Sequence, residues 1–307
     1  MAVRERRTFP LVPRRRLTGL PFGDLASRRR GPGGEIIGTR PYEPGDPVST
    51  IDWFATARLS AASGGDEFVV RDRAADEAPR VAIVVDRRPA MGLYPEPLPW
   101  LSKRDALREA VAAIAASAAA ARADIAALDF AGGSAWWLPP GRRDRPWQVL
   151  EREGGDTPFD APEDTLALSL EFLARRRSDL PGGSFVFVLS DFLAPPPLEM
   201  WLLAGGNGWD VVPVAIQDPV WEASFPGVAG VAVPVVDPRG GRVSLVRVGR
   251  REAARRRRDN ELRREQLLAG FASLGLGAVE LGTSDPLGVD LAFIDWADER
   301  RRGRWAR

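Results

Sequence analysis

From residue 80 to residue 285, short apolar runs alternate with helical patterns, and this alternation limits the fold more than any other feature of the sequence. Runs of continuously apolar residues separated by helices are typical of a parallel sheet covered on both faces. We therefore predict an α/β protein with a doubly wound, mostly parallel sheet. The five runs are RVAIVVD (80–86), ADIAALDFAG (123–132), SFVFVLSDF (184–192), WDVVPVAIQD (209–218) and GAVELGTSD (277–285).

Between the first two runs, an apolar stripe at helical spacing (Leu107, Val111, Ile114 and Ala118) predicts an amphipathic helix. Residues 164–177 predict a second helix, because Asp164 or Thr165 can cap its start and arginines fill its last turn.

After the fourth run the pattern changes. Residues 228–249 predict two strands joined by Asp-Pro-Arg-Gly-Gly, which is a β-hairpin instead of a crossover. The hairpin is either an insertion or an antiparallel edge of the sheet. A long, highly charged helix is expected to begin near Arg251, with a solvated face.

Residues 1–79 are rich in Gly, Pro and Arg, and residues 68–73 (FVVRDR) are their clearest strand, beside a pair expected around a Pro-Gly-Asp turn. We predict a basic, mobile arm over residues 1–33 and a small β-rich subdomain over residues 34–79. The α/β domain then covers residues 80–300, and residues 301–307 form a basic tail.

The chain contains no Cys and no His, which excludes thiol nucleophiles, His-assisted serine triads, disulfides and Cys/His zinc sites. Oxygen ligands alone remain for a metal, and these favour Mg²⁺, Mn²⁺ or Ca²⁺. The formal net charge of +1 gives no overall attraction to nucleic acid. No run approaches the roughly 20 apolar residues of a membrane span, and we expect a cytoplasmic protein.

Two acidic residues, Asp86 and Asp191, end the first and third apolar runs. In open α/β sheets the working crevice lies beyond the carboxyl ends of the strands. Strand-end carboxylates are ligands for a hard cation, so the sequence raises the question of a metal site at this edge.

VVDRRPAM, followed by a helix, a threonine-bearing loop and VLSDF, resembles the von Willebrand factor A-type fold. The metal-ion-dependent adhesion site of that fold consists of Asp-x-Ser-x-Ser, a Thr and an Asp. The resemblance implies Asp86, Asp191 and either Thr157 or Thr165 as ligands of Mg²⁺ or Mn²⁺. This chain departs from the motif, because Arg88 and Ala90 replace the two serines.

The substitution itself indicates a physical alternative to a metal. The Arg88 guanidinium is permanently charged and forks onto carboxylates, so we expect it to serve as a surrogate cation for Asp86 or Asp191 in a degenerate site that binds no metal. The competing interpretation is that Arg87 and Arg88 both point into water.

Residues 40–58 (RPYEPGDPVSTIDWFATAR) resemble the signature of the bacterial family called domain of unknown function 58, in which this signature precedes an A-type domain. Asp52 is expected to pair with Arg40, Arg58 or Arg71. Two roles remain open for the stretch, a clamp between subdomain and sheet and a docking face, and Trp53 is a core residue in the first. The signature and candidate interface residues are Arg40, Tyr42, Pro44, Gly45, Asp46, Asp52, Trp53, Arg58 and Arg71.

The family resemblance implies a non-enzymatic adaptor that binds a MoxR-type AAA+ ATPase and acts in assembly, maturation or chaperoning of protein complexes. Two rival hypotheses stand beside it. The first is a metal-dependent hydrolase that uses Asp86, Asp191 and Asp129. The second is a nucleic-acid binder that uses the Arg4 to Arg30 arm and Arg255 to Arg258.

Overall fold

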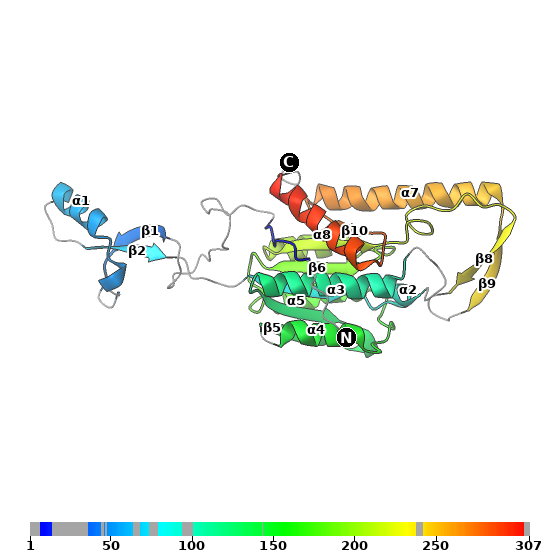
Figure 1. The fold of residues 1–307 in the computed structure, drawn as a ribbon, viewed down its shortest axis with the longest axis horizontal. Coiled ribbons are helices and arrows are strands. Elements are labelled where there is room, and N and C mark those ends of the chain that lie inside the picture. The colour runs from blue at the N-terminus through cyan, green and yellow to red at the C-terminus, as the bar shows by residue number, and fades with distance from the viewer. Residues whose placement is uncertain are drawn as a thin grey trace. The chain divides into compact units, whose positions relative to one another are not determined.

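The computed structural model describes residues 7–13, 36–43, 46, 48–63, 68–73, 79–93, 101–142, 144–237 and 242–303. The chain divides into two compact units (Figure 1). One unit contains Met1–Arg15 and Pro79–Arg307, and the other contains Arg16–Ala78.

The larger unit is built on a six-stranded sheet with the order β10-β7-β6-β3-β4-β5. All neighbouring strands are parallel except β4 and β5, so the predicted α/β class with a mostly parallel sheet is confirmed. The strands are β3 (Arg80–Val85), β4 (Asp124–Asp129), β5 (Trp136–Gly141), β6 (Phe185–Ser190), β7 (Asp210–Ile216) and β10 (Val279–Leu281).

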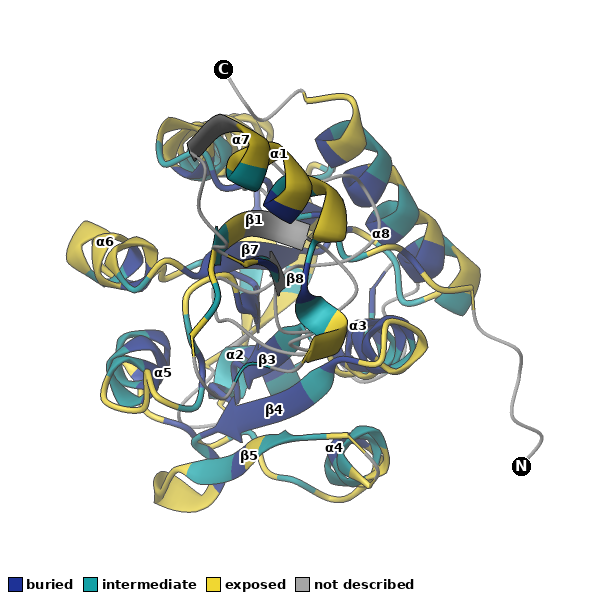
Figure 2. Cartoon of the chain, turned by 90° about the vertical axis from the view of Figure 1, so that its left-hand side faces the viewer, coloured by how far each residue is buried: buried dark blue, intermediate teal, exposed yellow. Residues whose placement is uncertain are grey.

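Helices cover both faces of this sheet, which is why its central strands are mostly apolar. Every residue of β6 and β7 is buried. Helices α5 (Thr165–Ala174), α6 (Leu198–Gly206) and the C-terminal part of α7 (Arg250–Ser273) contribute to the core on one face. Helices α3 (Lys103–Ala120), α4 (Arg145–Gly154) and α8 (Pro286–Arg301) lie on the other face (Figure 2).

The strand order reverses between β3 and β6. From β3 the chain proceeds to β4 and β5 on one side, and from β6 it proceeds to β7 and β10 on the other side. Such a switch point opens a crevice at the carboxyl ends of the two strands, so Asp86 and Asp191 flank the place where α/β proteins bind ligands.

The predicted hairpin is present as β8 (Val231–Val236) and β9 (Val243–Val248), which form a separate antiparallel two-stranded sheet. Its base packs in a satellite core of Phe225, Val248 and Ala253. Helix α7 follows β9 directly, as the predicted long charged helix. In Figure 1 the hairpin lies at the same end of the unit as the short helix α2 (Pro89–Gly92), which follows β3.

Residues 7–13 differ from the mobile arm predicted for residues 1–33, because they pack on the α/β unit. The Phe9 ring stacks on Phe293 at 4.8 Å between centroids, and its backbone N–H donates to Ser117 Oγ at 3.0 Å. Arg300 donates to the carbonyl oxygen of Val12 at 3.0 Å. The apolar Phe9 and Val12 among arginines explain the difference; residues 1–6 and 14–33 lie outside the described residues.

The smaller unit pairs β1 (Ile36–Pro41) with β2 (Val69–Arg73) in an antiparallel ribbon. The prediction of a β-rich subdomain missed a helix between these strands, α1 (Trp53–Ser63). Asp52 begins this helix, since its Oδ1 accepts hydrogen bonds from the backbone of Phe54 (3.1 Å) and Ala55 (3.0 Å).

The strand pair expected around the Pro-Gly-Asp turn is instead the pairing of β1 with β2, which join distant segments. Pro44 and Gly45 lie outside the described residues. Within the part of the chain that the structure describes, no helix is long and apolar enough to cross a membrane.

Candidate functional site

The two predicted carboxylates lie together at the switch point, and both are completely buried. Asp86 follows β3 and Asp191 follows β6. The backbone N–H of Asp86 donates to the carbonyl oxygen of Leu189 at 3.0 Å, which holds the two strand ends side by side. Phe192, the next residue after Asp191, has a φ of 50°, a left-handed conformation that is unusual for a bulky residue. The edge is therefore a compact and locally strained turn.

Arg88 binds both of these carboxylates. Its Nε lies 2.9 Å and its terminal guanidinium nitrogen 2.6 Å from Asp86 Oδ2, and the same terminal nitrogen lies 3.1 Å from Asp191 Oδ1. Ser190 Oγ accepts from this nitrogen at 3.1 Å and donates to Asp86 Oδ2 at 2.7 Å. Arg87 and Arg88 are only 2% and 4% exposed, so the interpretation that both point into water is wrong.

Lys103 is a second cation at the same edge, and the sequence analysis did not assign it a role. It is the first residue of α3, and its Nζ donates to Asp191 Oδ2 at 2.9 Å. Its Nζ also forms an ion pair with Glu222, which lies on the segment between β7 and β8. The available signal was that Lys103 is the only lysine among 43 basic residues. Two cations and three carboxylates thus share one buried cluster.

The charged forms of this cluster are held by their mutual attraction. Burial alone would raise the pKa of Asp191, but attraction to Lys103 and Arg88 outweighs burial and leaves that pKa below its ordinary value. Burial would lower the pKa of Lys103, and its two carboxylate partners raise it above the ordinary value instead. The pKa of Glu222 is raised, chiefly by burial. Asp191, which touches both cations, is therefore held in its charged form.

These residues do not fit Mg²⁺ or Mn²⁺. A hard cation needs about six oxygen ligands with free lone pairs, whereas Asp86 Oδ2 already accepts from Arg88 and Ser190, and Asp191 Oδ2 accepts from Lys103. Positions 88 and 90 supply no hydroxyl group. Among the described residues there is also no group of three or more Asp, Glu, His or Cys side chains placed to hold a metal.

The two candidate threonines lie in different environments. Thr157 is half-buried, and its Oγ1 donates to the carbonyl oxygen of Arg152 at 2.7 Å. Thr165 begins α5 and is completely buried, and its Oγ1 has no hydrogen-bond partner among the described residues. Neither hydroxyl has a hydrogen bond to Asp86 or Asp191 within the described part of the chain.

A second buried cluster surrounds Asp129 at the end of β4. Arg152 donates to both oxygens of Asp129, at 3.0 and 2.9 Å, and Asp129 Oδ1 also accepts from the backbone of Ala131 at 3.0 Å. Arg87 lies 3.5 Å from Asp129 and pairs with Glu153. Burial raises the pKa of Glu153 to about 7. Asp129 is thus a turn-forming residue neutralised by arginine.

The signature stretch forms two separate ion pairs in the smaller unit. Arg40 grips Asp46 with two hydrogen bonds of 2.7 and 2.6 Å, and Asp46 closes a turn by accepting from the backbone of Glu43 at 2.9 Å. Of the three expected arginine partners of Asp52, the structure pairs it with Arg71, whose Nε lies 3.0 Å from Oδ2.

The aromatic residues of the signature are partly open to solvent. Tyr42 and Trp53 both contact Phe68 edge to face, at centroid distances of 6.4 and 6.0 Å. Trp53 is 59% exposed and Phe54 is 80% exposed, and Arg58 lies beside Phe54 on the same exposed face of α1. The clamp and the docking face both stay predictions for this stretch.

Fold and site together define a class: a mostly parallel α/β protein whose carboxyl-edge carboxylates are neutralised by its own buried Arg and Lys, preceded by a small β-ribbon and helix. Residues 38–267 match the family described as Protein of unknown function DUF58. The chain belongs to this family.

Relatives of this chain occur in mycobacteria. It is 30% identical over 216 residues to Uncharacterized protein Rv1480 of Mycobacterium tuberculosis and to Uncharacterized protein Mb1516 of Mycobacterium bovis. Each alignment covers 69% of this chain and 64% of the relative, so this chain spans less than two thirds of those proteins.

Two solved structures share weak similarity with the chain. One is an aerotolerance-related membrane protein from Bacteroides fragilis, with 14% identity, a TM-score of 0.44, and coverage of 72% of this chain and 99% of the other. The other is an uncharacterized membrane spanning protein from Vibrio fischeri, with 14% identity, a TM-score of 0.21, and coverage of 70% and 98%.

Proposed function

We propose that this chain is a non-enzymatic, cytoplasmic protein-binding adaptor. Its partner is a MoxR-type AAA+ ATPase, and the pair acts in the assembly, maturation or chaperoning of other protein complexes. The larger unit is a von Willebrand factor A-like domain whose adhesion site is degenerate, with Arg88 as the surrogate cation. The proposal extends the resemblance of the signature stretch and the VVDRRPAM and VLSDF segments.

The observation that carries the proposal is that the carboxylates at the carboxyl ends of β3 and β6 are already paired with cations of the chain. Asp86 and Asp191 are completely buried and bound to Arg88 and Lys103. A hydrolytic site needs a carboxylate or a metal that is free to activate water. Carboxylates that already accept hydrogen bonds from fixed cations favour a structural role for this edge, and a structural edge supports a binding protein over a catalyst.

Asp129 supports the same conclusion. The hydrolase hypothesis needs it as a third carboxylate, but both of its oxygens accept from Arg152 and its side chain is 1% exposed. A carboxylate whose two oxygens are both bound to a fixed guanidinium is not free to orient a water molecule for attack.

Affinity capture tests the proposal. The tagged full chain is used as bait in its own cell lysate, with ATP or ADP and with Mg²⁺ or EDTA, and bound proteins are identified by mass spectrometry. We expect an AAA+ ATPase to be retained, and to persist with ADP in EDTA because the edge needs no metal. A bait with Asp52→Ala and Arg71→Ala tests the signature stretch, and Arg175→Ala, which is exposed on the other unit, is its control. Recovery of no ATPase above an untagged control in every condition would overturn the adaptor proposal.

A further inference from the structure

One face of the β8–β9 hairpin is covered only near its base, and the other face is exposed and largely apolar. Side chains alternate between the faces of a strand, and Val233 and Val248 pack toward the satellite core with Phe225. The opposite face is formed by Ala232, Pro234, Val243, Leu245 and Arg247, all of which are exposed. Leu245 is 74% exposed and Val243 is 62% exposed. A solvent-facing hairpin surface is ordinarily polar, so this face is suited to contact another molecule.

The outer edge of β9 is open for strand pairing. The backbone N–H of Asp237 donates to the carbonyl oxygen of Arg242 at 2.9 Å, which fixes which residues are hydrogen-bonded across the hairpin. By this alternation, Val243, Leu245 and Arg247 turn their N–H and C=O groups away from β8. Among the described residues no third strand joins this sheet.

The outer edge of β8 is less suited to pairing. By the same alternation Pro234 lies at a position that faces outward, and proline has no N–H to donate to an added strand. Protein edges are commonly protected in this way. One edge of the hairpin is thus interrupted, and the other keeps every donor and acceptor.

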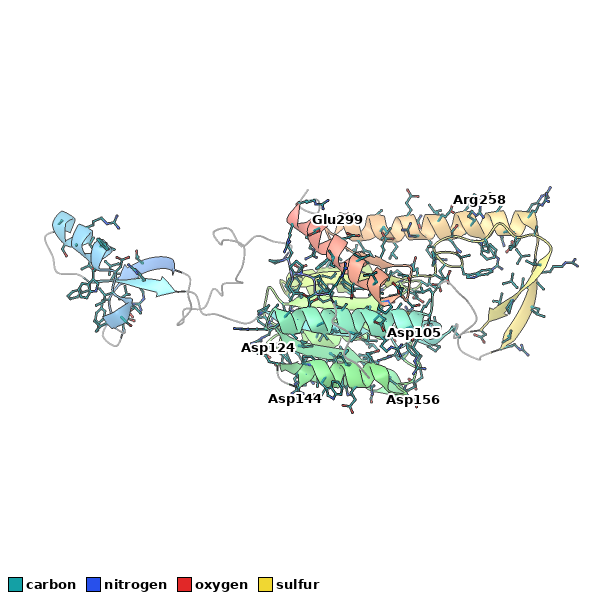
Figure 3. All side chains as sticks on the ribbon, in the orientation of Figure 1. Asp105, Asp124, Asp144, Asp156, Arg258 and Glu299 are labelled. Atoms are coloured by element: carbon teal, nitrogen blue, oxygen red, sulfur yellow. The ribbon has the colours of Figure 1, made fainter. Side chains whose placement is uncertain are left out.

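The surroundings of this open edge are strongly basic. Residues 228–258 contain nine arginines and only two acidic residues, in a chain with a net charge of +1. Arg255 and Arg256 share Glu252, while Arg242, Arg247, Arg250 and Arg251 are exposed beside the edge. Figure 3 shows Arg258 on the half of α7 nearest the hairpin. A complementary ligand must carry negative charge.

We propose that the outer edge of β9 binds an extended, acidic segment of a partner protein by strand addition. The added strand pairs with the backbone of Val243, Leu245 and Arg247, its alternate apolar side chains cover Leu245, and its carboxylates face the arginines. This proposal rests on the adaptor function and names the surface through which the adaptor binds its partner.

Two other occupants fit the surface less well. Nucleic acid would use aromatic side chains on which bases stack, whereas the exposed hairpin face carries only aliphatic side chains and arginine among its described residues. Pairing with a second copy of this chain would bring two basic hairpins together, and repulsion between like charges disfavours that pairing.

The test uses the full chain and a fluorescent synthetic peptide of alternating valine and glutamate, with fluorescence anisotropy as the readout. Peptides of alternating valine and lysine, and of valine and glutamine, are the comparisons. Leu245→Pro removes one outward N–H and the apolar side chain, and Leu245→Thr removes the apolar side chain alone. Arg247→Glu reverses one charge at the edge, and Arg175→Glu makes the same charge change at the residue that follows α5.

We expect salt-sensitive binding of the glutamate peptide and weaker or no binding of the other two. Leu245→Pro and Arg247→Glu should each weaken binding by about tenfold or more, Leu245→Thr by less, and Arg175→Glu should leave binding unchanged. Hydrogen exchange of the full chain should slow at the amides of residues 243–247 when the peptide is added. Circular dichroism and thermal melting establish whether each variant is folded. If Leu245→Pro is unfolded, the effect of Arg247→Glu on peptide binding tests the proposal instead.

Several results would overturn the strand-addition proposal. These are no binding of the glutamate peptide, equal binding of the lysine peptide, and binding that neither hairpin variant changes. Binding of single-stranded RNA or DNA that Arg247→Glu abolishes and Leu245→Thr preserves would assign the surface to nucleic acid. A dimer that Leu245→Pro dissociates would assign it to a second copy. If the Arg247→Glu bait still captures the ATPase, the adaptor proposal holds and the strand-addition proposal is refuted. If the glutamate peptide binds but no ATPase is captured, the strand-addition proposal holds and the adaptor proposal is refuted.

Discussion

Replacing Arg88 with serine, together with Ala90→Ser, would rebuild the Asp-x-Ser-x-Ser motif and should exchange an internal cation for a metal requirement. In the native chain the Arg88 side chain forms three hydrogen bonds with Asp86 and one with Asp191, and all three side chains are buried. Removing one partner of a buried ion pair costs about 3 to 5 kcal/mol, because it leaves a carboxylate without a counter-charge. For a unit of this size, we expect the melting temperature to fall by about 6 to 20 °C in EDTA.

A divalent cation should reverse part of this loss in the double variant. An ion at 100 times its dissociation constant adds about 2.7 kcal/mol, which corresponds to an increase in melting temperature of about 5 to 11 °C. The native chain should show no such increase, because Arg88 and Lys103 already occupy the carboxylate oxygens.

The assay is thermal unfolding, followed by circular dichroism, in EDTA, Mg²⁺, Mn²⁺ or Ca²⁺. Arg175→Ser, which removes an arginine that is 80% exposed, controls for the loss of one positive charge. Stabilisation of the native chain by Mg²⁺ by several degrees would refute the reasoning. So would a double variant that melts in EDTA within about one degree of the native chain, since the guanidinium would then not be a needed counter-charge.

Three further predictions concern the α/β unit. Lys103→Met should lower the free energy of unfolding, measured in urea, by about 3 to 5 kcal/mol, because it leaves Asp191 and Glu222 without their shared cation. The pKa of Asp191 is lowered in the folded chain. Its contribution to the free energy of unfolding is therefore present above its unfolded pKa and is lost as the pH falls through the folded value. Burial raises the pKa of Glu153 from 4.5 to about 7, so native stability should fall as the pH rises across that interval, and Glu153→Gln should remove this fall when urea midpoints at about pH 5 and about pH 8 are compared. Phe9→Ala should cost about 3 to 5 kcal/mol, measured by calorimetry, whereas a mobile arm would make it neutral.

The strands could be predicted because burial on both faces demands continuous apolar runs, and such runs are visible without knowledge of their partners. All five predicted runs contain a strand of the sheet. The antiparallel edge strand β5 contains two consecutive prolines, which hide a strand in the sequence. Helix α1 was missed because its start depends on Asp52, and aspartate is also favoured in turns. The apolar residues of the helix also form no stripe along one face.

The candidate site was only half predictable. Asp86, Arg88 and Asp191 follow strands that the pattern placed at one edge, so their proximity could be argued from topology. Lys103 and Glu222 come from the start of a helix and from an irregular segment, and hydrophobic periodicity does not place either of them. The sequence also could not show which arginine pairs with Asp52. Arg71 is brought near by the pairing of β1 with β2, and no local sequence pattern predicts that these two distant segments pair.

Glu222 connects the carboxyl ends of the strands to the hairpin. The presence of Arg88 and Lys103 in place of a metal ion therefore bears on the hairpin as well as on stability. Its side chain binds Lys103 and accepts from the backbone of Asp218 at 3.0 Å, while its carbonyl oxygen accepts from Arg263 of α7 at 2.8 Å. The segment that leads into β8 is therefore fastened at one end to the edge and along its length to α7. A bound metal can leave such an edge, whereas Lys103 and Arg88 are part of the chain and cannot. We therefore expect the hairpin base to keep its position in EDTA and in Mg²⁺, which hydrogen exchange of residues 221–225 under the two conditions would check.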